Sequence, residues 1–200
     1  MYELHFLYVM VNQRKIFMKK ILSLLIILTT VIACFGCGKK NTVQIKDTQE
    51  ILEKTWSQFT DQERFQVIGG DYEHQKNNEP GKFSLENKDA LEMLLLVKGN
   101  SQSMLDDASG LIHAMNANTF TGAAFHVMDK NNTDDFVVEM EESIMKNQWL
   151  CGFPEVAKIW KINDDYVVMT FGIRMNVSNF EKNLTAVYPT AELVFDELIG

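Results

Sequence analysis

The second half of the chain alternates between strand-like and helix-like hydrophobic patterns, and this alternation restricts the folds that it can adopt. Short apolar runs rich in β-branched and aromatic residues predict strands at 119–128, 155–162, 166–173 and 192–199. Stripes with helical spacing predict helices over about 133–150 and 177–187. The resulting order, β-α-β-β-α-β, predicts an α+β fold of the ferredoxin-like kind, with two helices on one face of an antiparallel sheet.

The predicted strands are apolar on both faces, which a sheet with one solvated face does not show. We therefore expect additional N-terminal helices to pack on the second face. Their apolar stripes lie at 48–60, 84–97 and 101–116, and Asp47 or Thr48 caps the first. Residues 65–83 contain turn signals and are expected to be irregular. Residues 47–200 are then one α+β domain.

The N-terminus has the pattern of a processing signal. Lys19 and Lys20 precede an apolar run at 21–32 that is shorter than the about 20 residues that span a bilayer. A basic segment, an apolar segment and a small residue are typical of a secretory signal peptide, here residues 1–33. Residues 1–17 are interpreted as an upstream start that precedes the true initiator.

Val31-Ile32-Ala33-Cys34 follows this apolar run and resembles the lipobox of bacterial lipoproteins. The resemblance implies that Cys34 receives a diacylglyceryl anchor and becomes the new N-terminus. Cys37 is the alternative, but Cys34-Phe35-Gly36 before it lacks the branched residue. An ordinary secretory signal or an uncleaved anchor remains the other interpretation.

Removal of residues 1–33 takes away four basic side chains and one acidic one, so the net charge changes from −8 to −11. A domain with this negative charge is repelled by phosphate backbones and by anionic lipid headgroups, which argues against a nucleic-acid partner. We expect residues 34–46 to form a lipidated polar tether. The lipid then holds the protein at the membrane.

A further resemblance rests on the lipobox, a Gly-Gly-Asp turn at 69–71, Met115-Asn116-Ala117-Asn118-Thr119-Phe120, Trp149-Leu150-Cys151-Gly152-Phe153-Pro154 and Val187-Tyr188-Pro189. Together they resemble small lipoproteins of anaerobic Gram-positive bacteria, some of them labelled bacteriocin transport accessory protein. The resemblance implies the outer face of a Gram-positive plasma membrane and a neighbouring envelope or transport complex. It implies no catalytic residues.

Three residues are weak candidates for chemistry. Cys151 lies in a segment similar to a thioredoxin active site, but Pro154 stands where the second cysteine belongs, so a buried apolar cysteine is the plainer interpretation. His113 and His126 fall in predicted regular structure without a metal ligand at the required spacing, so core or edge histidines are expected, and a functional site would require both to face one crevice with Asp129. The chain has no nucleophile elbow, phosphate-binding loop or metalloprotease motif, and we expect no enzyme activity, metal or cofactor.

Trp160, with Lys158 and Tyr166 beside the predicted hairpin, is the candidate surface for a protein partner, although such aromatic residues are more often packed in the core of a sheet covered on both faces. The sequence therefore predicts a membrane-anchored, non-enzymatic binding or accessory module. Two alternatives stay open. One is a thiol-dependent redox accessory that uses Cys151, and the other is a solute-binding lipoprotein with a pocket between the N-terminal helices and the sheet.

Overall fold

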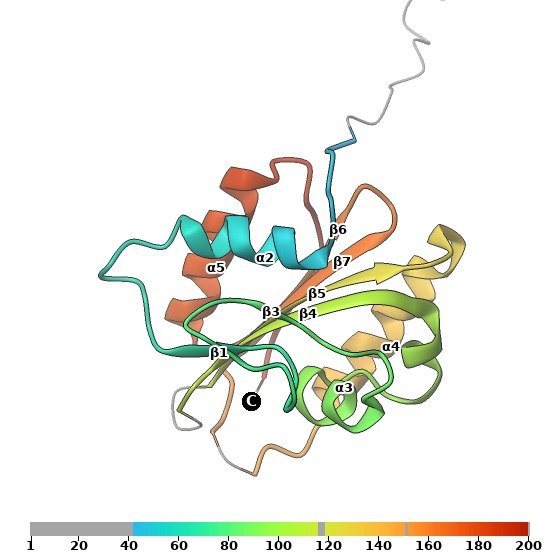
Figure 1. Cartoon of the computed structure of the whole chain (residues 1–200), viewed down its shortest axis with the longest axis horizontal. Coiled ribbons are helices and arrows are strands. Elements are labelled where there is room, and N and C mark those ends of the chain that lie inside the picture. Colours follow the sequence, from blue (N-terminus) through green and yellow to red (C-terminus); the bar gives the residue numbers. More distant parts are fainter. Residues whose placement is uncertain (1–41, 116–118, 151, 200) are drawn as a thin grey trace, which may run out of the picture. The chain divides into compact units, whose positions relative to one another are not determined.

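An antiparallel sheet organises the part of the chain that the computed structural model describes, residues 42–115, 119–150 and 152–199 (Figure 1). Its strand order is β2-β1-β4-β5-β7-β6-β8, and β3 also pairs with β4. Every pairing is antiparallel. The strands are β1 (Val67–Gly69), β2 (Lys76–Asn77), β3 (Gly81–Lys82), β4 (Leu105–His113), β5 (Phe120–Val127), β6 (Val156–Ile162), β7 (Tyr166–Gly172) and β8 (Glu192–Leu198).

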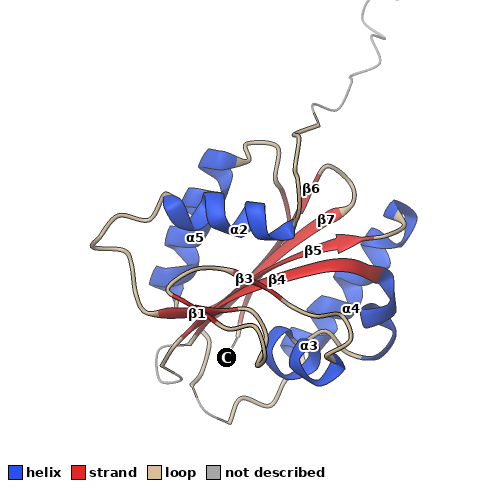
Figure 2. Cartoon of the chain, viewed as in Figure 1, coloured by secondary structure: helices blue, strands red, loops and turns tan. Residues whose placement is uncertain are grey.

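The helices cover both faces of this sheet (Figure 2). They are α2 (Thr48–Ser57), α3 (Lys88–Leu95), α4 (Thr133–Met145) and α5 (Arg174–Val187), with short 3₁₀ turns η1 (Gly99–Met104) and η2 (Lys130–Asn132). All the described residues belong to one compact unit, Asn41–Gly200. The predicted α+β class is confirmed.

Two hydrophobic cores lie on the two faces. The first packs α3 and α4 on the sheet, with Leu91, Phe125 and Phe136 among its fully buried side chains. The second packs α2 and α5 on the other face, around Trp160 and Phe180. Successive strand residues point to opposite faces, so strands buried on both sides need apolar side chains at nearly every position.

The expectation that both helices of the β-α-β-β-α-β unit cover one face is wrong. α4 packs in the first core and α5 in the second, and β8 lies beside β6 at the edge of the sheet. The connections β5-α4-β6 and β7-α5-β8 step in the same direction across the sheet, but they leave strands that run in opposite directions. Two crossovers of the same hand therefore place their helices on opposite faces.

The predicted helix at 101–116 is also wrong, because η1 and the strand β4 occupy this segment. β4 lies between β5 and the short strands β1 and β3, and it is buried on both faces. Its apolar residues therefore need not alternate, and their spacing matched a helical stripe. The N-terminal helices consequently divide between the faces, with α2 beside α5 and α3 beside α4.

Several local predictions are confirmed. Asp47 caps α2 by accepting the Glu50 N–H, and the β6–β7 hairpin turns through Asn163, whose φ is +60°. Other boundaries are corrected, since α4 ends at Met145 and the region expected to be irregular contains β1, β2 and β3. The signal peptide and the tether up to residue 41 lie outside the described residues.

Candidate functional site

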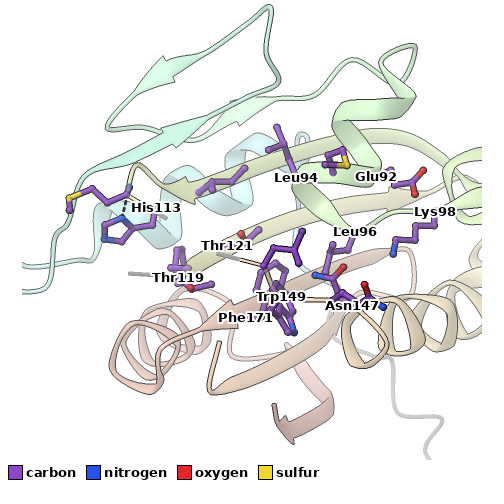
Figure 3. A pocket seen from close by; sticks show the side chains of 16 residues that line it. Glu92, Leu94, Leu96, Lys98, His113, Thr119, Thr121, Asn147, Trp149 and Phe171 are labelled. Carbon is purple, nitrogen blue, oxygen red and sulfur yellow. Dashed lines mark hydrogen bonds between the residues drawn. The ribbon is translucent and has the colours of Figure 1, made fainter. Parts of the chain in front are cut away.

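A groove of about 420 Å³ opens beside α3, at the end of the sheet where β4 and β7 finish and β5 begins (Figure 3). α3 forms one wall, and residues 147–150, which follow α4, form the other. Apolar side chains from these elements line it: Leu94, Leu96, Ile112, Trp149 and Phe171. A cavity of 300–1,000 Å³ with apolar walls and a few polar groups is typical of a small-molecule site.

The wall formed by α3 is held by local hydrogen bonds. The Asn87 side chain accepts the Ala90 N–H at the start of the helix, and Leu96 ends it with a φ of +58°. The side-chain amide of Gln102 donates to the carbonyls of Lys88 and Val97, at both ends of the helix. These hydrogen bonds hold both ends of α3, and Glu92, Met93 and Leu94 of this helix line the groove.

Three large apolar side chains lie exposed at the rim of this groove. Met93, Met115 and Leu150 are 71%, 53% and 87% exposed, and all three line the cavity. Inside, the rings of Trp149 and Phe171 lie 5.0 Å apart. Exposed apolar groups gathered around a concavity mark binding sites more often than isolated ones do, and methionine adapts to varied ligands.

His113 lies at the edge of the groove, where β4 ends, and its exposure is 9%. Its Nδ1 accepts the backbone N–H of Met115 at 2.9 Å, and its ring stacks on Phe65 with centroids 4.9 Å apart and planes 7° apart. Burial lowers the pKa of the imidazole below its usual range. The side chain is therefore neutral at neutral pH, and its proton is on Nε2.

The other polar side chains of the groove are not engaged within the described structure. Those of Thr121, Asn147 and Gln148 make no hydrogen bond to a described residue, although the Thr121 carbonyl accepts a bond from Thr170. Thr119 Oγ1 is buried, also with no partner among these residues. Asn147 is half-buried and Gln148 is exposed, so water can satisfy both. A buried hydroxyl such as Thr119 Oγ1, in contrast, is nearly always paired in folded proteins and is the group that a ligand would have most reason to engage.

His113 and His126 do not meet in one site, because they lie at opposite ends of the sheet. A β-bulge in β4 directs Asp106 toward His126, whose Nδ1 hydrogen-bonds to that carboxylate. His126 Nε2 lies 3.6 Å from Asp165 Oδ2 on the other side. Of the two histidines only His113 lies beside the groove, and its ring packs on the second face of the sheet, against Phe65.

The candidate partner surface is corrected. Trp160 is 1% exposed and packs in the second core, because its strand is covered by α5. Lys158 lies under the same helix and pairs with Glu181 and Asp196, at 2.9 Å each. Tyr166 is half-buried, and its ring lies 4.6 Å from that of His126. Trp160 and Lys158 therefore support the fold, and of the two aromatic residues only Tyr166 is partly exposed.

The three cysteines, Cys34, Cys37 and Cys151, lie outside the described residues. Within the described ranges, no three His, Cys, Asp or Glu side chains gather as metal ligands. No described helix is both long enough and apolar enough to cross a bilayer.

Most of the groove was not predicted from the sequence. Residues 147–150 were expected to continue α4, and Ile112 was placed in a helix rather than at the end of β4. The groove is formed by segments that are distant in the sequence, so local patterns do not predict it. The one local indication was the group of apolar side chains at 149–153, next to Gly152 and Pro154, residue types that commonly follow the end of a helix.

Comparison of the chain with models of protein families, with curated proteins and with solved structures finds no match. The class of this protein is therefore described from its own fold and site. It is a mixed α+β domain with an eight-stranded antiparallel sheet, helices on both faces and an apolar groove at one end.

Proposed function

We propose that the protein is a lipid-anchored, extracytoplasmic binding module that holds a small apolar ligand in the groove beside α3. This is a non-enzymatic role on the outer face of a Gram-positive plasma membrane. The expected lipoprotein function and the solute-binding alternative thereby become one proposal, in which a neighbouring envelope protein delivers or receives the ligand.

The observation that supports it is the composition of the groove. Leu94, Ile112 and Trp149 are only partly buried, so the bare protein leaves apolar surface in contact with water there. Burial of apolar surface contributes roughly 25 cal/mol per Å², which favours an apolar ligand over water at this place. The unengaged hydroxyl and amide groups provide the few directional contacts that orient such a ligand.

The proposed location is supported by the sequence alone. The lipobox-like segment that ends at Cys34 and the polar stretch after it would tether the domain close to the lipid surface. The net charge of −11 expected after processing would keep the acidic body away from anionic headgroups. A module at this position can take up apolar molecules that leave or approach the bilayer.

A thermal-shift screen of the full chain, purified in a mild detergent, tests the binding proposal. Small neutral apolar compounds should raise the melting temperature, since a ligand at 100 times its Kd adds about 2.7 kcal/mol. Met93→Trp should abolish the shift by filling the mouth of the groove. Met175→Trp is the matched control, because Met175 is 67% exposed on α5 and does not line the groove. Equal shifts in both variants would place binding elsewhere.

The anchor has its own test. The intact mass of the membrane fraction from a Gram-positive host should show a diacylglyceryl group on a chain that begins at Cys34. Cys34→Ala should release an unmodified protein, whereas Cys37→Ala should not change the modification. A lipid that persists in Cys34→Ala would disprove this processing site.

A further inference from the structure

Thr121 is the polar member of a row of three side chains that crosses the floor of the groove. Ile112 of β4, Thr121 of β5 and Phe171 of β7 are paired neighbours across the sheet, and all three line the cavity. Phe120 points into the second core, so the alternation along the strand directs Thr121 to the first face, together with Ile112 and Phe171. The Thr121 side chain therefore faces the groove (Figure 3).

The hydroxyl of Thr121 lacks the hydrogen bond that other buried threonines make. Thr121 is only 5% exposed, yet its Oγ1 makes no hydrogen bond to a described residue. The other buried threonines of the described structure each bond through the hydroxyl to a side chain or a carbonyl: Thr48, Thr55, Thr133 and Thr170. Because buried polar groups are nearly always paired, the Thr121 hydroxyl requires a partner from outside the described structure, either water or a ligand.

The Thr121 oxygen is within reach of such a partner. Oγ1 of Thr119, two residues earlier on the same face, is among the unpaired atoms that are closed off from solvent, whereas Oγ1 of Thr121 is not. The Thr121 oxygen thus keeps a small contact with solvent, and the groove is the opening that this side chain faces. Further along the same strand face, Ala123 and Phe125 are fully buried in the first core. The hydroxyl therefore lies where the cover by the helices ends.

The surroundings of this hydroxyl favour a ligand group without charge. Its neighbours on the floor, Ile112 and Phe171, are apolar. The charged side chains of the lining, Glu92 and Lys98, belong to α3 and the residues just after it, not to the sheet. A charge placed on the floor would lose its water without gaining a partner of opposite sign there. A neutral oxygen needs only a hydrogen bond, which a threonine hydroxyl can donate.

Resting on the proposed function, we infer that Thr121 is the polar subsite of the groove. The ligand is an uncharged apolar molecule with a hydroxyl or carbonyl oxygen, and this oxygen accepts a hydrogen bond from Thr121 Oγ1. The apolar body of the ligand lies against Leu94 and Trp149, which are only partly buried in the bare protein. Thr121 is then the residue that determines specificity between a hydrocarbon and its oxygenated analogue.

The test compares 1-tetralone with tetralin, which has the same carbon skeleton without the carbonyl oxygen. The full chain in detergent carries ¹⁵N in its tryptophan indoles, and the Trp149 resonance, assigned with Trp149→Phe, is followed while each compound is added. The measured quantity is the ratio of the two affinities in each variant. Because the detergent takes up each compound equally in every sample, the change in this ratio between variants is independent of partition.

Thr121→Val replaces the hydroxyl by a methyl group and should lower the preference for 1-tetralone about three- to ten-fold, as the loss of one neutral hydrogen bond allows. Tetralin binding should be retained. Thr121→Ser, which keeps the hydroxyl, should keep the preference, and so should Thr185→Val, because Thr185 is exposed on α5 and does not line the groove. Without a ligand, Thr121→Val should melt no lower than the unchanged protein, since valine favours strands and no hydrogen bond within the protein is lost.

Three results would overturn the inference, and they are distinguishable. If the preference persists in Thr121→Val, or falls equally in Thr121→Ser, the hydroxyl has no role and the groove still binds apolar ligands. If Thr121→Val melts lower than the unchanged protein or does not fold, the hydroxyl is bonded within the protein and is not a subsite. If neither compound shifts Trp149 in the unchanged protein, the ligand class is wrong, and a thermal-shift screen without a hit would then remove the binding proposal as well.

Discussion

Asp71 connects the turn after β1 to the start of the segment that carries α3, and its removal should loosen one wall of the groove. The side chain is fully buried. One carboxylate oxygen accepts the N–H groups of Glu73 and His74 and contacts the His74 ring, and the other accepts the Ser84 N–H at 2.7 Å. Burial alone would raise the pKa of this carboxyl, but the hydrogen bonds outweigh it and lower the pKa.

We expect Asp71→Asn to destabilise the protein by about 3 kcal/mol. The amide keeps one accepting oxygen but places an NH₂ group against a backbone N–H, which leaves buried donors without a partner. For a chain of this size, roughly 2–4 °C of melting temperature corresponds to each kcal/mol, so the midpoint should fall by about 6–12 °C. Ligand affinity in the groove should fall as well, because Ser84 precedes α3.

Thermal and urea unfolding followed by circular dichroism measure this change, with Asp61→Asn as the exposed control. A carboxyl whose folded pKa is lowered stabilises the protein above the unfolded value of about 3.9, and this contribution is lost as the pH falls through the folded pKa. The difference between the unchanged protein and Asp71→Asn should therefore shrink below about pH 4. A variant within about 0.5 kcal/mol of Asp61→Asn at pH 7 would refute the reasoning.

Three further predictions concern stability and are measured by the same unfolding experiments. Tyr188→Phe should be neutral or stabilising by up to about 1–3 kcal/mol, because the buried hydroxyl has no partner in the described structure. Burial also raises the Tyr188 pKa to about 12, so its contribution is complete below about pH 10 and is lost towards pH 12, and the variant should lack this loss. Lys158→Met should destabilise by about 1–3 kcal/mol, more than Lys161→Met, since the former leaves two carboxylates unpaired and the latter breaks one exposed pair. Gly69→Ala should destabilise by more than about 3 kcal/mol, since its Cβ would lie 2.3 Å from backbone atoms, while Gly99→Ala meets nothing within 4 Å and suffers only from its φ of +54°.

Much of the fold was readable in local patterns. The strands β5 to β8 and the hairpin at Asn163 were predicted because each has its own apolar run and turn residues. β4 was not, since a strand buried on both faces shows no alternation and its apolar spacing also fits a helix. The face of the sheet that each helix covers depends on the pairing of β8 with β6, which local residues do not encode.

The site was less predictable than the fold. His113 was singled out only as a histidine in regular structure, and what distinguishes it, the bond from Met115 and the stack on Phe65, depends on neighbours that the turn after β4 and the pairing of β1 with β4 provide. Trp149 was noted only in a short motif. Its role as a groove wall follows from the early end of α4, a boundary that sequence patterns place poorly.

The distribution of helices explains why the groove lies on one face of the sheet and not on the other. On the second face, the last turn of α2 and the first turn of α5 lie towards the sheet end near His113, and aromatic rings from Phe59, Phe65, Phe120 and Phe180 fill the space there. On the first face, α3 has only eight residues and α4 stops at Met145, so Ile112 at the same end of β4 and Trp149 after α4 are left partly uncovered. The groove is thus a consequence of two short helices on a sheet that is apolar on both sides, and substitutions that lengthen α4 into the segment before Leu150 should reduce its volume and its ligand affinity together.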